Sequence, residues 1–194
     1  MNFKRGELFL KKLIIIAGPS GAGKTTISNY LEKKYQIPRV LTHTTRAIRP
    51  GESKEDYYFE TEESFAELHL FESVKYGSYQ YGSSREGLEK AWEINDIVSL
   101  IVDTAGVKAY VEKLQPNQFY FIYIKVSDLS TLEERLVERG DEPTEILKRI
   151  NSREFKRDLQ LSEELKKYAH ILVNDNLGET ERKIDKLVNK LRNS

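Results

Sequence analysis

The sequence predicts an α/β fold, in which helices cover both faces of a doubly wound, mostly parallel sheet of about five strands. Three observations carry this prediction. The aliphatic run at residues 13–17 leads into a glycine-rich loop at residues 18–25, and a helical pattern follows directly. Short apolar runs alternate with helical patterns over residues 84–191. Between these regions, residues 43–87 lose the regular alternation, which indicates a lobe inserted into the sheet domain.

The loop has the spacing G-x-x-x-x-G-K-[ST], which is typical of a phosphate-binding loop. Its glycines allow successive backbone N–H groups to point at phosphate oxygens, and the N-terminus of the next helix adds partial positive charge. Lys24 would supply a full charge to the β- and γ-phosphates of a nucleoside triphosphate, and the Thr25 hydroxyl an oxygen ligand for Mg²⁺. The alternative is a turn that only joins strand to helix, and the strand–loop–helix context argues against it.

Size and composition limit the possible partners. A chain of 194 residues is one domain or one core with inserted lobes. With 31 basic and 31 acidic residues the net charge is zero, so no overall field attracts nucleic acid or an anionic membrane. Cysteine is absent, which excludes disulfides and cysteine-ligated zinc. No apolar run is long enough to span a bilayer, and Lys11 and Lys12 interrupt the first segment before it resembles a signal peptide, so we expect a cytoplasmic protein.

The individual elements follow from periodicity and from the residues that end helices. The first strand is almost continuously aliphatic, as expected when both faces of a parallel sheet are covered. Pro38 ends the helix after the loop, and Pro116 ends a later one. Ser130 and Glu133 predict a capping box at another helix start. The predicted strands are 13–17, 37–42, 97–102, 119–126 and 171–173, and the predicted helices are 24–35, 61–71, 84–93, 107–114, 130–138, 146–168 and 184–191.

Several short motifs follow the loop. They are Thr42-His43-Thr44-Thr45-Arg46, Arg49-Pro50-Gly51-Glu52, Asp56-Tyr57, Tyr81-Gly82-Ser83 and Val173-Asn174-Asp175. Together with the loop, these motifs recur in this order in guanylate kinases, and the chain resembles that family from about residue 13 to its last helix. Guanylate kinases transfer the γ-phosphoryl group of ATP to GMP or dGMP.

The resemblance implies a three-part domain. The core would comprise about 8–41, 89–137 and 156–194, a GMP-binding lobe about 42–88, and a mobile lid about 138–155. ATP with Mg²⁺ would bind the loop together with Arg135 of the core. The implied ATP-binding residues are Gly18, Pro19, Ser20, Gly21, Ala22, Gly23, Lys24, Thr25, Thr26 and Arg135, with Thr25 as the metal ligand.

Two arginines and two tyrosines suit an acceptor phosphate. Arg46 and Arg49 lie three residues apart after a predicted strand, and two guanidinium groups can each bond a phosphate dianion through two N–H groups. Tyr57 and Tyr81 offer phenolic donors without further charge. Taken singly, each would be an ordinary solvated arginine or core tyrosine. By resemblance, all four hold the phosphate of GMP.

The resemblance also implies which residues recognise the base. Glu72 would face guanine, whose N1–H and N2 amine are two donors that one carboxylate can accept together. Thr42 would donate its hydroxyl to O6, and Asp103 would accept the other N2 proton. Ser83 belongs to the same implied GMP-binding set. A solvated surface carboxylate is the ordinary role of a glutamate, so the family match carries this assignment.

Three arginines match family arginines that close on the triphosphate: Arg135, Arg139 and Arg149. Mobile guanidinium groups can neutralise the charge that spreads over phosphoryl oxygens in the transition state. For Arg153, in the same segment, the alternative is a charged helix pair on a solvated face, and we leave Arg153 out of this set. We expect the catalytic groups to be Lys24, Arg46, Arg139 and Arg149.

The chain departs from the family pattern at two positions near the expected site. The family's Asp-x-Asp at the end of the third strand is Ile101-Val102-Asp103 here, which bears on how Mg²⁺ is held, and its tryptophan after the base-recognising glutamate is Ser73. Two other functions remain open: a related kinase for another phosphorylated acceptor, and a non-catalytic guanylate-kinase-like interaction module. The intact loop and the lid arginines argue against the second. We expect ATP and GMP as partners, no nucleic acid or membrane, and a monomer or homodimer.

Overall fold

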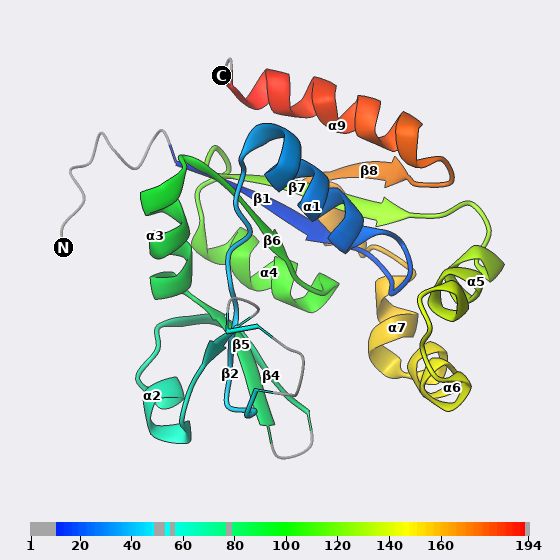
Figure 1. The fold of residues 1–194 in the computed structure, drawn as a ribbon. Coiled ribbons are helices and arrows are strands. Elements are labelled where there is room, and N and C mark those ends of the chain that lie inside the picture. The colour runs from blue at the N-terminus through cyan, green and yellow to red at the C-terminus, as the bar shows by residue number, and fades with distance from the viewer. Residues whose placement is uncertain (1–10, 49–52, 55–56, 77–78, 193–194) are drawn as a thin grey trace.

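A computed structural model describes residues 11–48, 53–54, 57–76 and 79–192 (Figure 1). Its centre is a four-stranded parallel sheet in the order β6-β1-β7-β8. Because β1 lies in the interior of this sheet, the loop that follows it emerges at the carboxyl edge, where ligands bind in open α/β sheets. The four strands are β1 (Lys12–Ala17), β6 (Ile97–Ile101), β7 (Phe119–Lys125) and β8 (Ala169–Val173).

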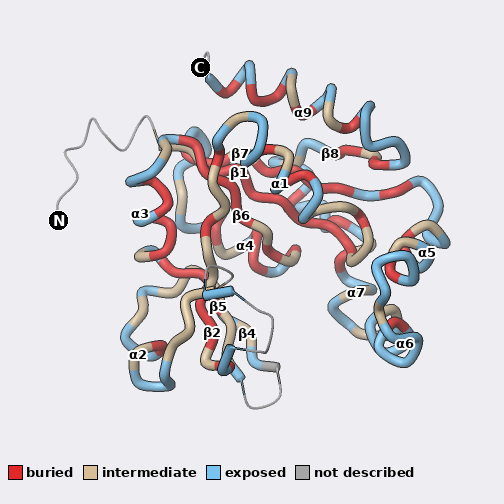
Figure 2. Tube along the Cα trace, viewed as in Figure 1, coloured by how far each residue is buried: buried red, intermediate tan, exposed pale blue. Residues whose placement is uncertain are grey.

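Helices cover both faces of this sheet, as predicted. Alternate residues of β1 contribute to two separate cores, with Leu13 and Ile15 in one and Ile14 and Ile16 in the other. Figure 2 shows the buried stretches concentrated along β1 and β7. The first core is covered by α3 (Arg85–Ile94), α4 (Thr104–Lys113) and the short α8 (Glu163–Lys166), and the second by α1 (Lys24–Tyr35) and α9 (Leu177–Arg192).

The prediction of about five strands needs one correction. Residues 37–42 do not form a full strand: they join the sheet at a single parallel bridge between Arg39 and Ser99. Two hydrogen bonds flank the bridge, from the Val40 N–H to the Ser99 carbonyl (2.7 Å) and from the Ser99 N–H to the Pro38 carbonyl (2.9 Å). Pro38 has no N–H to donate, so pairing cannot extend through it, and the chain turns away into the insert.

The inserted lobe is a second sheet, in the order β3-β2-β5-β4, with one short helix. The sequence predicted a helix at 61–71, but the helix ends at Ala66 and a strand begins at Leu70. Two of the strands have only two residues, which is too short for a periodic pattern. The elements are β2 (His43–Thr44), β3 (Tyr58–Phe59), α2 (Glu62–Ala66), β4 (Leu70–Tyr76) and β5 (Tyr79–Ser84).

The predicted helix 146–168 is three helices, because Ser152 and Ser162 each interrupt it with extended backbone. Ser152 accepts a hydrogen bond from the Phe155 N–H, and Ser162 accepts one from the Leu165 N–H. The predicted capping box is also wrong. Asp128, rather than Ser130, supplies the side-chain acceptor at that helix start, through Oδ1 and the Ser130 N–H (3.0 Å). In the described part of the chain, no helix has the length and apolar character needed to cross a membrane. Between β7 and β8 the helices are α5 (Ser130–Glu138), α6 (Pro143–Asn151), α7 (Arg153–Asp158) and α8.

Candidate functional site

The glycine-rich loop after β1 has a backbone that only glycine adopts readily. Gly18, Gly21 and Gly23 have φ values of 145°, 85° and 98°. A Cβ on Gly18 would lie 2.0 Å from the Ile124 carbonyl oxygen, so β7 leaves no room for a side chain there. Within the described residues no side chain caps α1, which leaves its first N–H groups open to an anion. The loop thus has the form that the sequence predicted.

Lys24, the first residue of α1, folds back over the loop. Its Nζ donates to the carbonyls of Gly18 (2.7 Å) and Pro19 (2.9 Å). Burial lowers the pKa of Lys24 to about 8, and the positive charges of Arg139 and Arg149 act in the same direction, while Asp158 opposes them. An anion in this place would restore the lysine's usual preference for the charged form.

A cavity of about 870 Å³ lies between the loop and α5–α6, and we call it the phosphate-loop cavity. Arg135 donates to the Asn174 carbonyl (2.8 Å) and Arg149 donates to Ser20 Oγ (3.1 Å), so both arginines contact neighbouring core segments. Arg139 is paired with Asp141. The predicted residues that line this cavity are Ser20, Gly21, Gly23, Lys24, Thr25, Thr26, Arg135, Arg139 and Arg149.

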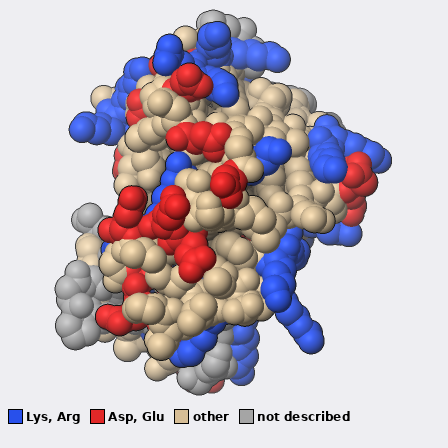
Figure 3. Space-filling model, turned by 90° about the vertical axis from the view of Figure 1, so that its right-hand side faces the viewer, with Lys and Arg blue, Asp and Glu red and all other residues tan. Residues whose placement is uncertain are grey.

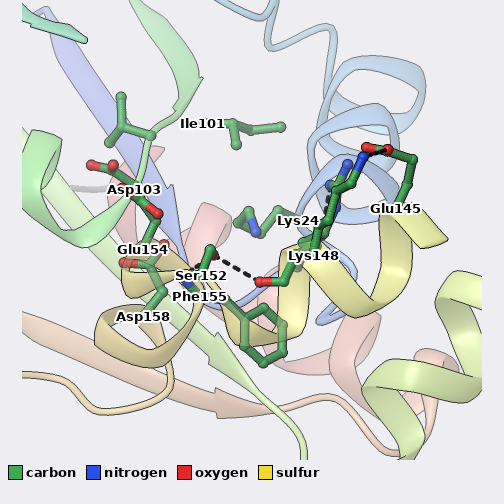
Figure 4. Close-up of a pocket in the computed structure, with 12 residues that line it drawn as sticks. Lys24, Ile101, Asp103, Glu145, Lys148, Ser152, Glu154, Phe155 and Asp158 are labelled. Atoms are coloured by element: carbon green, nitrogen blue, oxygen red, sulfur yellow. Dashed lines mark hydrogen bonds and ion pairs between the residues drawn. The ribbon is translucent and has the colours of Figure 1, made fainter. Parts of the chain in front are cut away.

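A second cavity of about 650 Å³, the central cavity, lies beside the first. Figure 4 shows Asp103, Glu154 and Asp158 on one side of it and Lys148 on the other, with Lys24 between them. Lys148 is itself paired with Glu145 at 2.6 Å, so acidic side chains lie on both sides of the central cavity, with Lys24 between them.

A third cavity of about 170 Å³, the insert cavity, lies between β6 and the second sheet. Thr42, Glu72, Tyr81 and Asp103 line it. Ser83 Oγ donates to Glu72 Oε1 at 2.6 Å. Burial raises the pKa of Glu72 above its ordinary value, and the nearby Asp103 carboxylate adds to the rise. A pair of carboxylates in a small, half-buried cavity suits a ligand that presents N–H donors.

Arg46 lies at the start of the insert and is 5% exposed. Its Nε donates to the Tyr81 hydroxyl (3.2 Å), and its guanidinium carbon lies 5.8 Å from the centre of the Tyr57 ring. The structure therefore brings three of the four predicted phosphate-binding residues together. Arg49 lies outside the described residues.

The three cavities form one series because neighbouring cavities share residues. The phosphate-loop and central cavities share Ser20, Lys24 and Arg149, and the central and insert cavities share Ile101, Val102 and Asp103. Figure 3 views the molecule from the side of α5 and α6 and shows basic and acidic side chains together on this face.

The sequence analysis missed a charged network at the boundary of α4 and α7. Arg157 donates to Asp103 Oδ2 (2.6 Å) and Asp158 Oδ1 (3.1 Å). Asp158 is buried, and its Oδ1 also accepts from the Thr104 hydroxyl (2.6 Å). No pattern identified Arg157 or Asp158, since Asp103 and Thr104, which they contact, lie more than 50 residues away. Asn174 stood out only as part of a motif, yet its amide donates to the Ala22 carbonyl (2.8 Å) and lines the phosphate-loop cavity.

The residues present fit a magnesium ion bound with phosphates. In the described ranges no three His, Asp or Glu side chains are grouped as metal ligands. Mg²⁺ commonly uses one or two protein oxygens and takes its other ligands from substrate phosphates and water. Thr25 is exposed at the loop, and Asp103 and Asp158 line the adjoining central cavity. Thr25 would supply one such oxygen, and substrate phosphates and water would supply the others.

Comparisons with known proteins agree on one family. A model of the family described as guanylate kinase matches residues 10–191. The guanylate kinase of Wolbachia pipientis wMel is 32% identical over 187 residues, covering 93% of this chain and 90% of that protein. That of Sus scrofa is 34% identical over 173 residues, covering 84% and 85%. The crystal structure of guanylate kinase from Anaplasma phagocytophilum has a TM-score of 0.60 at 22% identity, covering 93% of this chain and 85% of that one, which shows the shared α/β fold.

Proposed function

The chain belongs to the guanylate kinase family, and we propose that it transfers the γ-phosphoryl group of ATP to GMP or dGMP, with Mg²⁺ as cofactor. The observation that carries this proposal is the series of three cavities. It runs from a phosphate-binding loop with a partly buried lysine to a small cavity lined by Glu72 and Asp103. A donor and an acceptor nucleotide bound at the two ends would have their phosphates facing each other across the central cavity.

The donor end holds and orients a triphosphate. The open N–H groups of α1 and the loop would bind the β- and γ-phosphates, and Lys24 would follow the γ-phosphoryl group during transfer. Arg139 and Arg149 would neutralise the charge that develops on its oxygens, and Arg135 would bind ATP from α5. Mg²⁺, held through Thr25, supplies further charge neutralisation on the phosphates.

The acceptor end holds GMP through its phosphate and its base. Arg46, Tyr57 and Tyr81, with Arg49, would bind the phosphate, and no general base is required. A phosphate monoester has a second pKa of about 6, so GMP is already mostly a nucleophilic dianion at neutral pH. Catalysis then depends on positioning and electrostatics. Thr42, Ser83, Asp103 and Glu72 would recognise guanine.

We assign the lobe at about 42–88 to GMP and the segment at about 138–155 to a lid over ATP. Three observations support the lid. A side chain at Gly140, whose φ is +85°, would meet no described atom within 4 Å of its Cβ, and such open space suits a hinge between α5 and α6. The backbone breaks again at Ser152. Arg149 reaches the loop by its hydrogen bond to Ser20 Oγ, which lid movement could make and break.

A steady-state assay across nucleoside monophosphates tests the proposal. With ATP and Mg²⁺ fixed, we expect GMP and dGMP to be good acceptors and AMP, CMP and UMP to be poor ones. ATP binding measured alongside separates the enzyme from a non-catalytic module, which would bind protein partners and have no use for ATP. Equal rates with all acceptors would contradict the assignment of the insert cavity to guanine.

The lowered pKa of Lys24 predicts a pH dependence of ATP binding. Below pH 8 the free protein carries a charged Lys24 that attracts the triphosphate, and above pH 8 the amine is increasingly neutral. We therefore expect kcat/KM for ATP to fall as pH rises through about 8. The kcat value, which reports the complex with both substrates, should fall only at higher pH, because bound phosphate stabilises the ammonium form. A kcat/KM profile that stays level to about pH 10 would contradict the role of this lysine.

Substitution of Ile101 tests how the protein binds Mg²⁺. It lines the central and insert cavities where the family pattern has an acid. We expect Ile101→Asp to lower the Mg²⁺ concentration needed for half-maximal activity by several-fold, about the effect of one added charged oxygen near a hydrated cation. Ile101→Asn is the matched control, since it adds a polar group of similar size without the charge. If the magnesium titration of Ile101→Asp coincides with the wild-type curve, the position serves only the core.

A further inference from the structure

The base-recognising carboxylate Glu72 follows an irregular point in its strand. β4 pairs with β5 at Leu70 opposite Ser84 and at Glu72 opposite Ser83, so Phe71 is an extra residue, a β-bulge. Bulges redirect the side chains that follow them, and here the redirected side chain is Glu72. β4 is also the edge strand of the second sheet as described, so no neighbouring strand of that sheet supplies donors to its outer carbonyls.

Lys113, in the last turn of α4, supplies those donors. Its Nζ lies 3.0 Å from the Leu70 carbonyl oxygen and 2.9 Å from the Phe71 carbonyl oxygen. These are the two residues of the bulge that precede Glu72. Lys113 thus joins a core helix to the insert at the point that sets the direction of the base-recognising side chain.

Tyr110, one turn before Lys113 on α4, contacts the same bulge from its buried side. Its ring stacks on Phe71, with centroids 4.3 Å apart and planes at 18°. Its side chain is fully buried, and its hydroxyl has no hydrogen-bond partner among the described residues. Burial raises the pKa of Tyr110 and the Glu72 charge adds to the rise, whereas the nearby Ser83 side chain lowers this pKa. A buried hydroxyl without a partner costs stability, so it requires an explanation.

At its N-terminus, α4 starts just after Asp103, the second of the two carboxylates that line the insert cavity. Asp103 Oδ1 caps the helix by accepting from the Gly106 N–H at 2.7 Å. Gly106 packs against Glu72: a Cβ there would lie 3.4 Å from Glu72 Cγ. One short helix therefore contacts both carboxylates near its start, through the Asp103 cap and Gly106, and the bulge before Glu72 near its end, through Tyr110 and Lys113.

We propose that α4 sets the position of Glu72 relative to Asp103, with Lys113 and Tyr110 as positioning residues for guanine selection. Lys113 holds the bulge. The Tyr110 hydroxyl donates to Ser83 Oγ when guanine is bound, while Ser83 donates to Glu72. Such a chain of hydrogen bonds stabilises the desolvated carboxylate more than either bond alone. The proposal rests on the proposed function, because it concerns how that site distinguishes guanine.

Lys113→Met tests the first residue. The substitution keeps most of the apolar stem and removes the two hydrogen bonds to β4. We expect KM for GMP to rise about tenfold, as for loss of one or two ordinary hydrogen bonds, with KM for ATP unchanged. Lys113→Arg retains donors and should restore most of the affinity. Lys108→Met is the matched control: Lys108 is exposed on the same helix and pairs with Glu164 (3.1 Å), away from β4. A wild-type KM for GMP in Lys113→Met would overturn its role.

Tyr110→Phe tests the second residue, because it removes only the hydroxyl and keeps the ring on Phe71. If the hydroxyl has no role, the substitution should leave the stability of the fold unchanged or increase it, and the kinetic constants should not change. The acceptor IMP has the N1–H of guanine but lacks the N2 amine, so the ratio of kcat/KM for GMP to that for IMP reports on Glu72 and Asp103. We expect this ratio to fall about fivefold while the melting temperature is kept or raised. An unchanged ratio would overturn the role of the hydroxyl.

Different results would contradict the proposed function and the proposed role of α4. If the wild-type protein does not phosphorylate GMP, the proposed function itself is wrong. If the wild-type protein strongly prefers GMP to IMP and the Lys113→Met and Tyr110→Phe variants behave in the same way as it does, only the role of α4 is wrong.

Discussion

Lys24→Ala is expected to lower kcat by about 10³-fold or more while the protein stays folded. Removing one preorganised donor from a developing oxyanion costs about 10²–10³ in kcat, and Lys24 carries a full charge in a partly buried site. The variant keeps the fold because Lys24 is not part of the apolar core, and its loss removes only two hydrogen bonds to loop carbonyls. Single-turnover phosphoryl transfer measures the loss of activity, and circular dichroism checks that the variant is folded.

Lys33→Ala is the matched control for this experiment. Lys33 is exposed on the same helix and lines none of the three cavities. Its removal should leave kcat and the melting temperature near wild-type values. Near-normal transfer by a folded Lys24→Ala variant would remove the phosphate-binding loop from the mechanism.

Glu72→Gln is expected to lower kcat/KM for GMP by about 10²-fold and to narrow the preference for GMP over AMP. The carboxylate would gain two charge-assisted hydrogen bonds from the N1–H and N2 amine of guanine, whereas adenine presents an unprotonated N1. A site that hydrogen-bonds its substrate in this way can discriminate by roughly 10⁴. Glutamine keeps the shape but lacks the charge and one acceptor.

The check is kcat/KM for GMP and AMP in both proteins. Glu112→Gln, an exposed glutamate on α4, is the control for loss of a carboxylate nearby, and it should leave both values unchanged. The ribose 2′-hydroxyl should matter little, so dGMP should follow GMP. Should Glu72→Gln discriminate as well as the wild-type protein, another group recognises guanine.

The parts of the fold that the sequence predicted are those encoded locally. The phosphate-binding loop depends on closely spaced glycines and Lys24, and β1 depends on five consecutive apolar residues. The structure confirms both. The helix at 84–93 was also predicted, from the helical spacing of Leu88, Ala91 and Trp92. The structure has it at Arg85–Ile94, with Ser84 as its cap.

The parts that the sequence did not predict depend on contacts between distant segments. The second sheet includes two-residue strands, β2 and β3, that only their neighbours stabilise. Arg157 meets Asp103 across 54 positions, and Lys113 meets the β4 bulge across more than 40. In the same way, Glu72 and Asp103 were assigned by family resemblance, and only the fold shows that they line one cavity.

One measurement tests the central claim directly: transfer of the labelled γ-phosphoryl group of ATP to an equimolar mixture of GMP, AMP, CMP and UMP with Mg²⁺. The phosphate-binding loop and the Glu72–Asp103 cavity together predict that nearly all of the transferred label appears in GDP, and that Lys24→Ala abolishes it. Label in another nucleoside diphosphate, or release as inorganic phosphate with all four acceptors unused, would contradict the account.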